Sequence, residues 1–154
     1  MNPSLKIYID RLKDGRKELI QEQFSPEEIA LNDQEIPFSG PVSLKAEVYL
    51  VDDELVLHLD LSATSTHSCS VCNQEVKHSI IIKNCYQTVE KSQIKGAIYD
   101  MSGLLRELLL LEVPSFVECE DNCPRRKDME KFLKRVDEKS ASHENPFSHL
   151  TIKE

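Results

Sequence analysis

Four of the five cysteines in this 154-residue chain are grouped in two close pairs. Two residues separate Cys69 from Cys72, and three residues separate Cys119 from Cys123. Thiolates at such spacings can reach one tetrahedral metal ion, and four thiolates are a common ligand set for structural zinc. The spacing therefore predicts a zinc site formed by Cys69, Cys72, Cys119 and Cys123.

Two other interpretations of these thiols stay open, namely incidental cysteines and a redox pair at Cys69 and Cys72. A redox pair is expected at a helix N-terminus near a βαβ pattern, where the helix dipole lowers a thiol pKa. The surrounding sequence instead predicts a turn between two strands. Asn73 follows the pair directly, and asparagine tolerates the left-handed backbone that metal-binding turns often need. This context favours metal over redox chemistry.

A shared ion would have a structural role, because 46 residues lie between Cys72 and Cys119. By analogy with disulfide loop closure, a cross-link over such a loop contributes roughly 4 kcal/mol, a large share of a small domain's stability. The remaining cysteine, Cys85, lies in a predicted strand and is expected to be a small core residue. His67 and His78 flank the first pair and are expected at the strand surface, as is His58.

The sequence contains no catalytic set. A G-x-S-x-G motif, a Walker A motif, a G-x-G-x-x-G motif and an H-E-x-x-H motif are all missing. We therefore expect a protein that is not an enzyme and has no small-molecule substrate.

A basic stretch follows the second cysteine pair, with six basic and three acidic residues between positions 121 and 135, a local charge of +3. Arginine and lysine can bind RNA phosphates, although such a stretch is also typical of a solvated helix face. The candidate contact residues are Arg125, Arg126, Lys127, Lys131, Lys134 and Arg135.

The whole chain is acidic, with 19 basic and 27 acidic residues and a net charge of −8. This charge excludes non-specific, whole-surface binding of nucleic acid and leaves room only for a local contact. The sequence contains no apparent signal peptide or membrane-spanning segment, so we expect a cytoplasmic protein with reduced thiols and no membrane partner.

Antiparallel strands are the elements expected to position the first cysteine pair. Alternating apolar residues predict strands over 42–50 and 55–63, joined by a turn at Asp52-Asp53. A third strand over 76–89 should return antiparallel to the second, with the first cysteine pair at the turn between them. A short strand over 5–10 and one or two helical turns after Ser25-Pro26 are also expected.

Helices should follow the sheet. Asp100 can cap a helix whose apolar face would cover the sheet and which Pro114 would end. The residues of that face are Met101, Leu104, Leu105, Leu108 and Leu111.

A second, charged helix is expected from about Arg125 to Glu138. The sequence therefore predicts a single α+β domain over 1–138, with a small antiparallel sheet arranged as a meander or a partly open barrel. It also predicts a flexible tail over 139–154 that contains Asn145, Pro146 and Phe147.

The order of these features over roughly residues 40 to 150 resembles the YceD family, the large ribosomal RNA subunit accumulation proteins. The resemblance lies in the Cys69-x-x-Cys72 hairpin, the helix over 99–114, the second cysteine pair, and the Asn145-Pro146-Phe147 motif with Leu150. It implies a bacterial or plastid type of protein that acts in ribosome biogenesis without catalytic activity. It also implies that the four cysteines bind zinc.

The sequence and the resemblance together suggest a non-enzymatic factor for synthesis, processing or accumulation of large-subunit ribosomal RNA. Its partner would be ribosomal RNA or a ribosome-assembly protein, contacted through the basic stretch or through the Asn145-Pro146-Phe147 segment. The alternative is a zinc-stabilised protein-interaction module that is unconnected with the ribosome.

Overall fold

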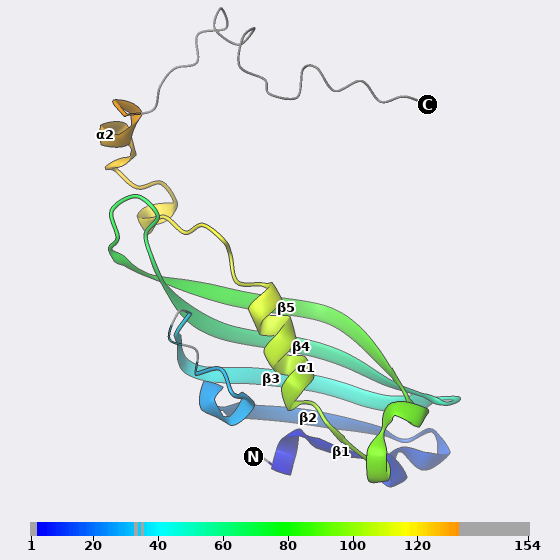
Figure 1. Cartoon of the computed structure of the whole chain (residues 1–154). Coiled ribbons are helices and arrows are strands. Elements are labelled where there is room, and N and C mark those ends of the chain that lie inside the picture. The colour runs from blue at the N-terminus through cyan, green and yellow to red at the C-terminus, as the bar shows by residue number, and fades with distance from the viewer. Residues whose placement is uncertain (1–2, 33, 35, 133–154) are drawn as a thin grey trace, which may run out of the picture.

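A four-stranded antiparallel sheet forms the body of the protein (Figure 1). Each strand pairs with the next one along the chain, so the sheet is a meander with two free edges. This arrangement confirms the predicted α+β fold and selects the meander over the partly open barrel. The strands are β2 (Lys17–Phe24), β3 (Phe38–Val51), β4 (Glu54–Ser68) and β5 (Glu75–Glu90).

The computed structural model describes residues 3–32, 34 and 36–132. Lys134, Arg135 and the predicted tail with Asn145, Pro146 and Phe147 lie outside the described residues. Within the described part of the chain, no helix is both long enough and apolar enough to cross a membrane.

The alternating pattern of β3 and β4 creates the core of the sheet. Their register places Ala46 opposite Leu59 and Val48 opposite Leu57, and all four side chains are buried on the same face. Successive side chains of a strand point to opposite faces, so the intervening polar residues face outward. The three predicted strands are confirmed, and the structure extends each at both ends.

The sequence analysis did not predict β2, which forms one edge of the sheet. Its residues are mostly glutamate, glutamine and lysine, which favour helices over strands. Only Ile20 and Phe24 in this strand are buried, whereas Leu19 is 75% exposed. An edge strand needs few apolar residues, so its apolar signal in the sequence is weak.

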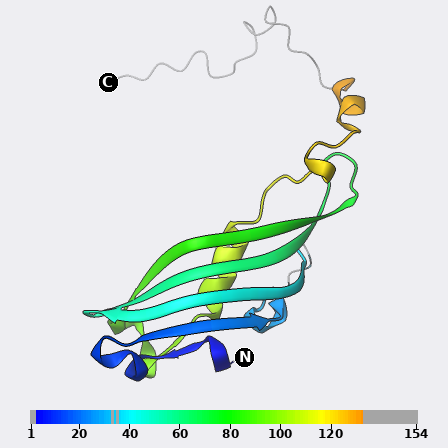
Figure 2. The same ribbon diagram turned by 180° about the vertical axis from the view of Figure 1, so that it is seen from behind.

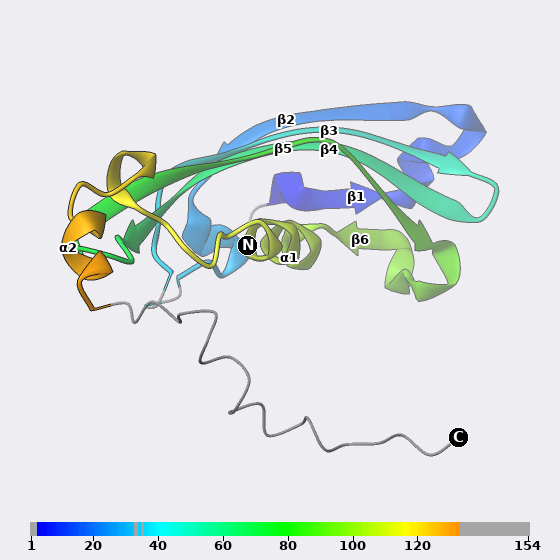
Figure 3. The same cartoon turned by 90° about the horizontal axis from the view of Figure 1, so that it is seen from above.

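The inner face of the sheet is covered by a second layer (Figure 3). Strands β1 (Lys6–Tyr8) and β6 (Ile98–Asp100) form a two-stranded sheet, and helix α1 (Ser102–Leu111) continues directly from β6. Short 3-10 helices connect these elements, including η3 (Pro26–Ile29), which confirms the helical turn predicted after Ser25.

The Asp100 side chain binds the start of helix α1, although Met101 and not Asp100 occupies the N-cap position, and the apolar face of the helix differs from the prediction. The Asp100 carboxylate accepts hydrogen bonds from the Ser102 backbone N–H (2.9 Å) and hydroxyl (2.5 Å). The buried row is Met101, Leu105 and Leu109, whereas Leu111 is 74% exposed. Leu111 lies at the end of the helix, where the chain leaves the sheet, so the face that packs is centred on Leu105.

The second helix ends earlier than predicted within the described residues, and positions 133–138 of the predicted helix lie outside them. Helix α2 covers Arg126–Glu130, and the next two residues, Lys131 and Phe132, form a turn. Nearly all its side chains are exposed, and Phe132 is 85% exposed. Because tertiary packing supplies most of the stability of short helices, a helix without a packed face extends only a little way.

Candidate metal centre

The first cysteine pair lies in the turn between β4 and β5, as the sequence predicted. The Cys69 N–H donates to the Gln74 carbonyl (2.7 Å), and the Asn73 N–H donates to the Cys69 carbonyl (2.9 Å). Asn73 has a φ of 60°, the left-handed conformation that asparagine accepts more readily than most residues. The turn therefore points Cys69 and Cys72 into one small volume.

The second pair lies in the segment that follows α1. The 3-10 turn η6 (Cys119–Asp121) holds Glu120 and Asp121 at φ values of 57° and 58°. Left-handed conformations at two successive non-glycine residues are costly, and they persist where the surrounding structure demands them. The loop that joins Cys119 to Cys123 is therefore held in an unusual backbone conformation.

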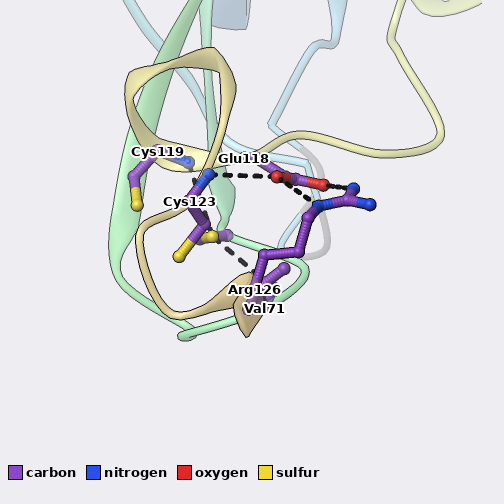
Figure 4. Close-up of polar contacts among 6 residues, drawn as sticks. Val71, Glu118, Cys119, Cys123 and Arg126 are labelled. Atoms are coloured by element: carbon purple, nitrogen blue, oxygen red, sulfur yellow. Dashed lines mark hydrogen bonds and ion pairs between the residues drawn. The ribbon is translucent and has the colours of Figure 1, made fainter. Parts of the chain in front are cut away.

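Glu118 organises this second loop (Figure 4). Its carboxylate accepts a hydrogen bond from the Cys123 backbone N–H (3.0 Å) and one from Arg126 Nε (3.3 Å), and it forms an ion pair with the same guanidinium. These contacts hold the pKa of the Glu118 carboxyl below its usual value, the Arg126 hydrogen bond being the largest cause. The sequence analysis missed Glu118, and no spacing or motif in the sequence marks it.

The two cysteine pairs meet although they are far apart in the sequence. The Ser70 N–H donates to the Val117 carbonyl (2.8 Å), which joins the β4–β5 turn to the segment after α1. The four sulfur atoms of Cys69, Cys72, Cys119 and Cys123 all lie within 4.8 Å of one another.

The sulfur spacing suits a tetrahedral ion. Cys72 Sγ and Cys119 Sγ are 3.7 Å apart, and all five cysteines are free thiols. A tetrahedral zinc ion with zinc–sulfur bonds of about 2.3 Å needs sulfur–sulfur distances of about 3.8 Å. The arrangement can therefore hold a metal ion with little movement of the side chains.

The cluster is largely shielded from solvent. Cys69 and Cys123 are buried, at 0% and 2% exposure, whereas Cys72 and Cys119 are half-buried. A small hollow of about 190 Å³ lies beside the cluster, lined by Cys72, Cys119, Cys123, Gln74 and Arg125 among others.

The electrostatics of the cluster separate the four thiols. Backbone N–H groups lower the pKa of Cys69 to about 6; the Cys72 N–H contributes most, and the N–H groups of Cys119 (3.4 Å) and Val71 (3.5 Å) add to it. The hydrogen bond with Cys123 and the neighbouring sulfurs raise the pKa of Cys119 to about 12, and burial raises the pKa of Cys123. Four thiolates can therefore coexist here only when a cation compensates their charge.

The basic stretch divides into parts with different surroundings. Arg126 is held by Glu118, and Arg125 lines the hollow beside the sulfurs, whereas Lys127 and Lys131 are exposed. Over residues 118–132, four basic residues face five acidic ones, a local charge of −1. The predicted +3 depends on Lys134 and Arg135, which lie outside the described residues, and on a window that leaves out Glu118 and Glu120.

The two histidines that flank the first cysteine pair and the fifth cysteine do not belong to the cluster of four sulfurs. His67 Nε2 is 2.7 Å from the Ser65 hydroxyl, and its ring meets the His78 ring edge-on at 6.2 Å between centroids. Neither histidine belongs to the sulfur cluster. Cys85 lies in the middle of β5 opposite Leu59 and packs against the core, as predicted for a structural cysteine.

Comparisons with protein-family models, with curated proteins and with solved structures give no match to this chain. The resemblance to the YceD family and the ribosomal role that it implies therefore stay predictions. The structure itself contributes a cluster of four free cysteines that can bind a metal ion.

Proposed function

We propose that Cys69, Cys72, Cys119 and Cys123 bind one structural zinc ion and that the protein is a non-enzymatic factor for synthesis, processing or accumulation of large-subunit ribosomal RNA. One observation carries the zinc assignment, namely the four sulfurs that converge within 4.8 Å from two distant segments. Zinc is the metal that four-thiolate sites in proteins most often hold, and such closed sites serve structure.

The ribosomal part of the proposal is supported by the order of the cysteine pairs, the leucine-rich helix and the Asn145-Pro146-Phe147 motif along the chain. In this role the ion ties the β4–β5 turn to the segment after α1 and gives both a fixed shape, which the protein presents to ribosomal RNA or to an assembly protein. A zinc-stabilised interaction module without a ribosomal partner would use the same site.

A thiol oxidoreductase is the second candidate, and the low pKa of Cys69 is the observation that favours it. Two features of the site oppose this role. Cys69 has no exposed surface, so its sulfur is screened from a substrate disulfide. The amides that stabilise its thiolate belong to a turn between strands and to the loop of Cys119, and such amides also suit a metal-bound thiolate.

Metal analysis of the full chain purified without chelator tests the zinc assignment. We expect one equivalent of zinc in the wild type and in Cys85→Ser, the matched control for loss of a thiol. We expect a near-complete loss in the double variants Cys69→Ser/Cys72→Ser and Cys119→Ser/Cys123→Ser. Zinc retained by either double variant would contradict a shared site.

Sedimentation tests the ribosomal role. In a sucrose gradient of a bacterial lysate, the tagged full chain should sediment with precursors of the large ribosomal subunit, and the cysteine variants should leave those fractions. If the zinc-loaded wild type stays at the top of the gradient, the interaction module without a ribosomal partner is the correct function.

A further inference from the structure

No other described element covers the outer face of the four-stranded sheet (Figure 2). Strands β1 and β6 and helix α1 all lie on the opposite side (Figure 3). Cross-strand register arranges the outer side chains in rows. One row consists of Leu19, Glu47, His58 and Tyr86.

A shallow hollow of about 530 Å³ lies in the middle of this face and touches all four strands. Gln21, Gln23, Ser43, Lys45, Ser62 and Lys83 contribute amide, hydroxyl and ammonium groups to its lining, and the exposed side chain of Ile81 adds an apolar part. Such a lining offers hydrogen-bond donors and acceptors beside apolar surface. The hollow therefore suits an extended ligand that combines polar groups with flat apolar faces.

The positive charges at the hollow are available to a ligand. Within the described part of the chain, Lys45 and Lys83 have no ion pair, and both are exposed. Two acidic residues line the hollow. Glu22 lies opposite Leu44 in the inward-facing set of β2, and Asp60 is held by the bulge of β5, where its carboxylate accepts the Asn84 N–H (2.8 Å). Two ammonium groups beside an engaged carboxylate favour an anionic ligand.

An aromatic pair lies beside the hollow. His58 and Tyr86 are stacked, with ring centroids 4.3 Å apart and an angle of 4° between the ring planes. His58 also forms a hydrogen bond with the Asn84 side chain (3.3 Å), which fixes the stack against the bulge. Tyr86 is 60% exposed, so its ring remains accessible to a flat ligand group.

We propose that this outer face binds a single-stranded segment of RNA. Lys45 and Lys83 contact phosphates, a base stacks on Tyr86, and the glutamine and serine side chains of the hollow contact sugars and base edges. This combination of basic side chains and an exposed aromatic ring is how proteins bind unpaired nucleic acid on a sheet. The inference rests on the proposed function, for which it supplies the RNA-binding surface.

The positions of the apolar side chains argue against a protein as the ligand of this face. The two most exposed apolar residues of this face, Leu19 and Ile81, lie on the opposite edge strands β2 and β5, and only Ile81 lines the hollow. A protein partner or second copy would need a contiguous apolar patch at the centre of the contact. The outward-facing charged side chains of the hollow are Lys45 and Lys83 against Asp60, a charge of +1, whereas residues 118–132 carry −1.

The test is fluorescence anisotropy of the zinc-loaded full chain with a labelled 12-nucleotide single-stranded RNA of mixed sequence at several salt concentrations. Lys45→Ala/Lys83→Ala should raise Kd about tenfold and reduce the salt dependence, because each lost phosphate contact removes about 0.7 from the slope. Tyr86→Ala should raise Kd at least about fivefold. Lys91→Ala/Lys95→Ala, at exposed positions in the short 3-10 helices after β5, is the matched control and should change Kd less than about twofold. A Lys127→Ala/Lys131→Ala variant tests the basic stretch as the competing surface.

Three outcomes would overturn the inference: absence of RNA binding by the wild type, unchanged binding by the Lys45/Lys83 variant, or a loss confined to the Lys127/Lys131 variant. All variants change exposed side chains, and equal melting temperatures would show that they fold alike. Sedimentation of the same variants separates this inference from the proposed function. If all of them sediment with ribosomal precursors and bind RNA like the wild type, the sheet face is wrong while the ribosomal role stands.

Discussion

The body of the sheet and the cysteine cluster are stabilised by different interactions. In β3 and β4, buried apolar side chains face one another along most of two long strands. The cluster joins the turn after β4 to the segment after α1 through one backbone hydrogen bond from Ser70 and four sulfur atoms. Burial of apolar side chains is sufficient to order the body of the sheet. The cluster needs a cation to balance the negative charge of its thiolates.

This difference predicts that metal removal acts first on the cluster. With a chelator, amides at Ser70, Asn73 and Cys123 should lose their protection from hydrogen exchange, while amides of β3 and β4 stay protected. Loss of a cross-link over 46 residues should also lower the free energy of unfolding by roughly 4 kcal/mol. Exchange mass spectrometry and denaturant melts with and without chelator measure the two effects. If the amides of β3 and β4 lost as much protection as those of the cluster, the two regions would not be stabilised separately.

A substitution in the core tests whether the body of the sheet is stable independently of the cysteine cluster. Leu59→Ala removes a fully buried side chain from β4 and should cost about 3 kcal/mol of unfolding free energy. The folded protein should still bind one equivalent of zinc, because Leu59 lies in the body. Leu19→Ala, at a 75% exposed position of β2, is the matched control and should cost less than about 0.5 kcal/mol. Loss of zinc from folded Leu59→Ala would show that the body and the cluster are coupled.

Glu118 holds the second cysteine loop in place, and its loss should have a smaller effect than the two changes above. Its carboxylate binds the Cys123 N–H and the Arg126 guanidinium, so Glu118→Ala should weaken zinc binding about tenfold without changing the stoichiometry at saturation. Competition with a chromophoric chelator measures the affinity. The control is Lys17→Ala, which breaks the ion pair with Glu47 on the body and should leave zinc affinity unchanged. An unchanged zinc affinity in Glu118→Ala would mean that Glu118 does not contribute to the affinity of the four cysteines for the ion.

The two regions also differ in how well the sequence predicts them. Strands β3 and β4 follow from alternation because a buried face repeats every second residue, and the first cysteine turn follows from its spacing and from Asn73. Strand β2 lacks such a signal because an edge strand buries only Ile20 and Phe24. Glu118 contacts Cys123 and Arg126, five and eight residues ahead in the sequence, within an irregular loop. Such a loop has no repeating pattern of side chains, so these contacts leave no recognisable signal in the sequence.

The smallest effect is expected at Asp100, the last residue of β6, whose carboxylate binds the first residue of helix α1. Asp100→Ala removes the acceptor for the Ser102 N–H and hydroxyl and should cost about 1 kcal/mol at neutral pH, with no change in zinc affinity. Partial burial favours the neutral carboxyl, but the Ser102 hydrogen bonds outweigh it and hold the pKa of Asp100 below its ordinary value.

The stabilising effect of Asp100 is therefore fully present above the pKa of the unfolded carboxyl, 3.8, and is lost as the pH falls through the lower pKa of the folded state. Denaturant melts of the wild type and Asp100→Ala should converge over that range. Asp100→Asn keeps an acceptor oxygen without a titrating charge, so it should retain most of the stability and show a smaller change with pH. A difference between the wild type and Asp100→Ala that persists in acid would mean that the substitution acts through packing of α1 on the body and not through the cap.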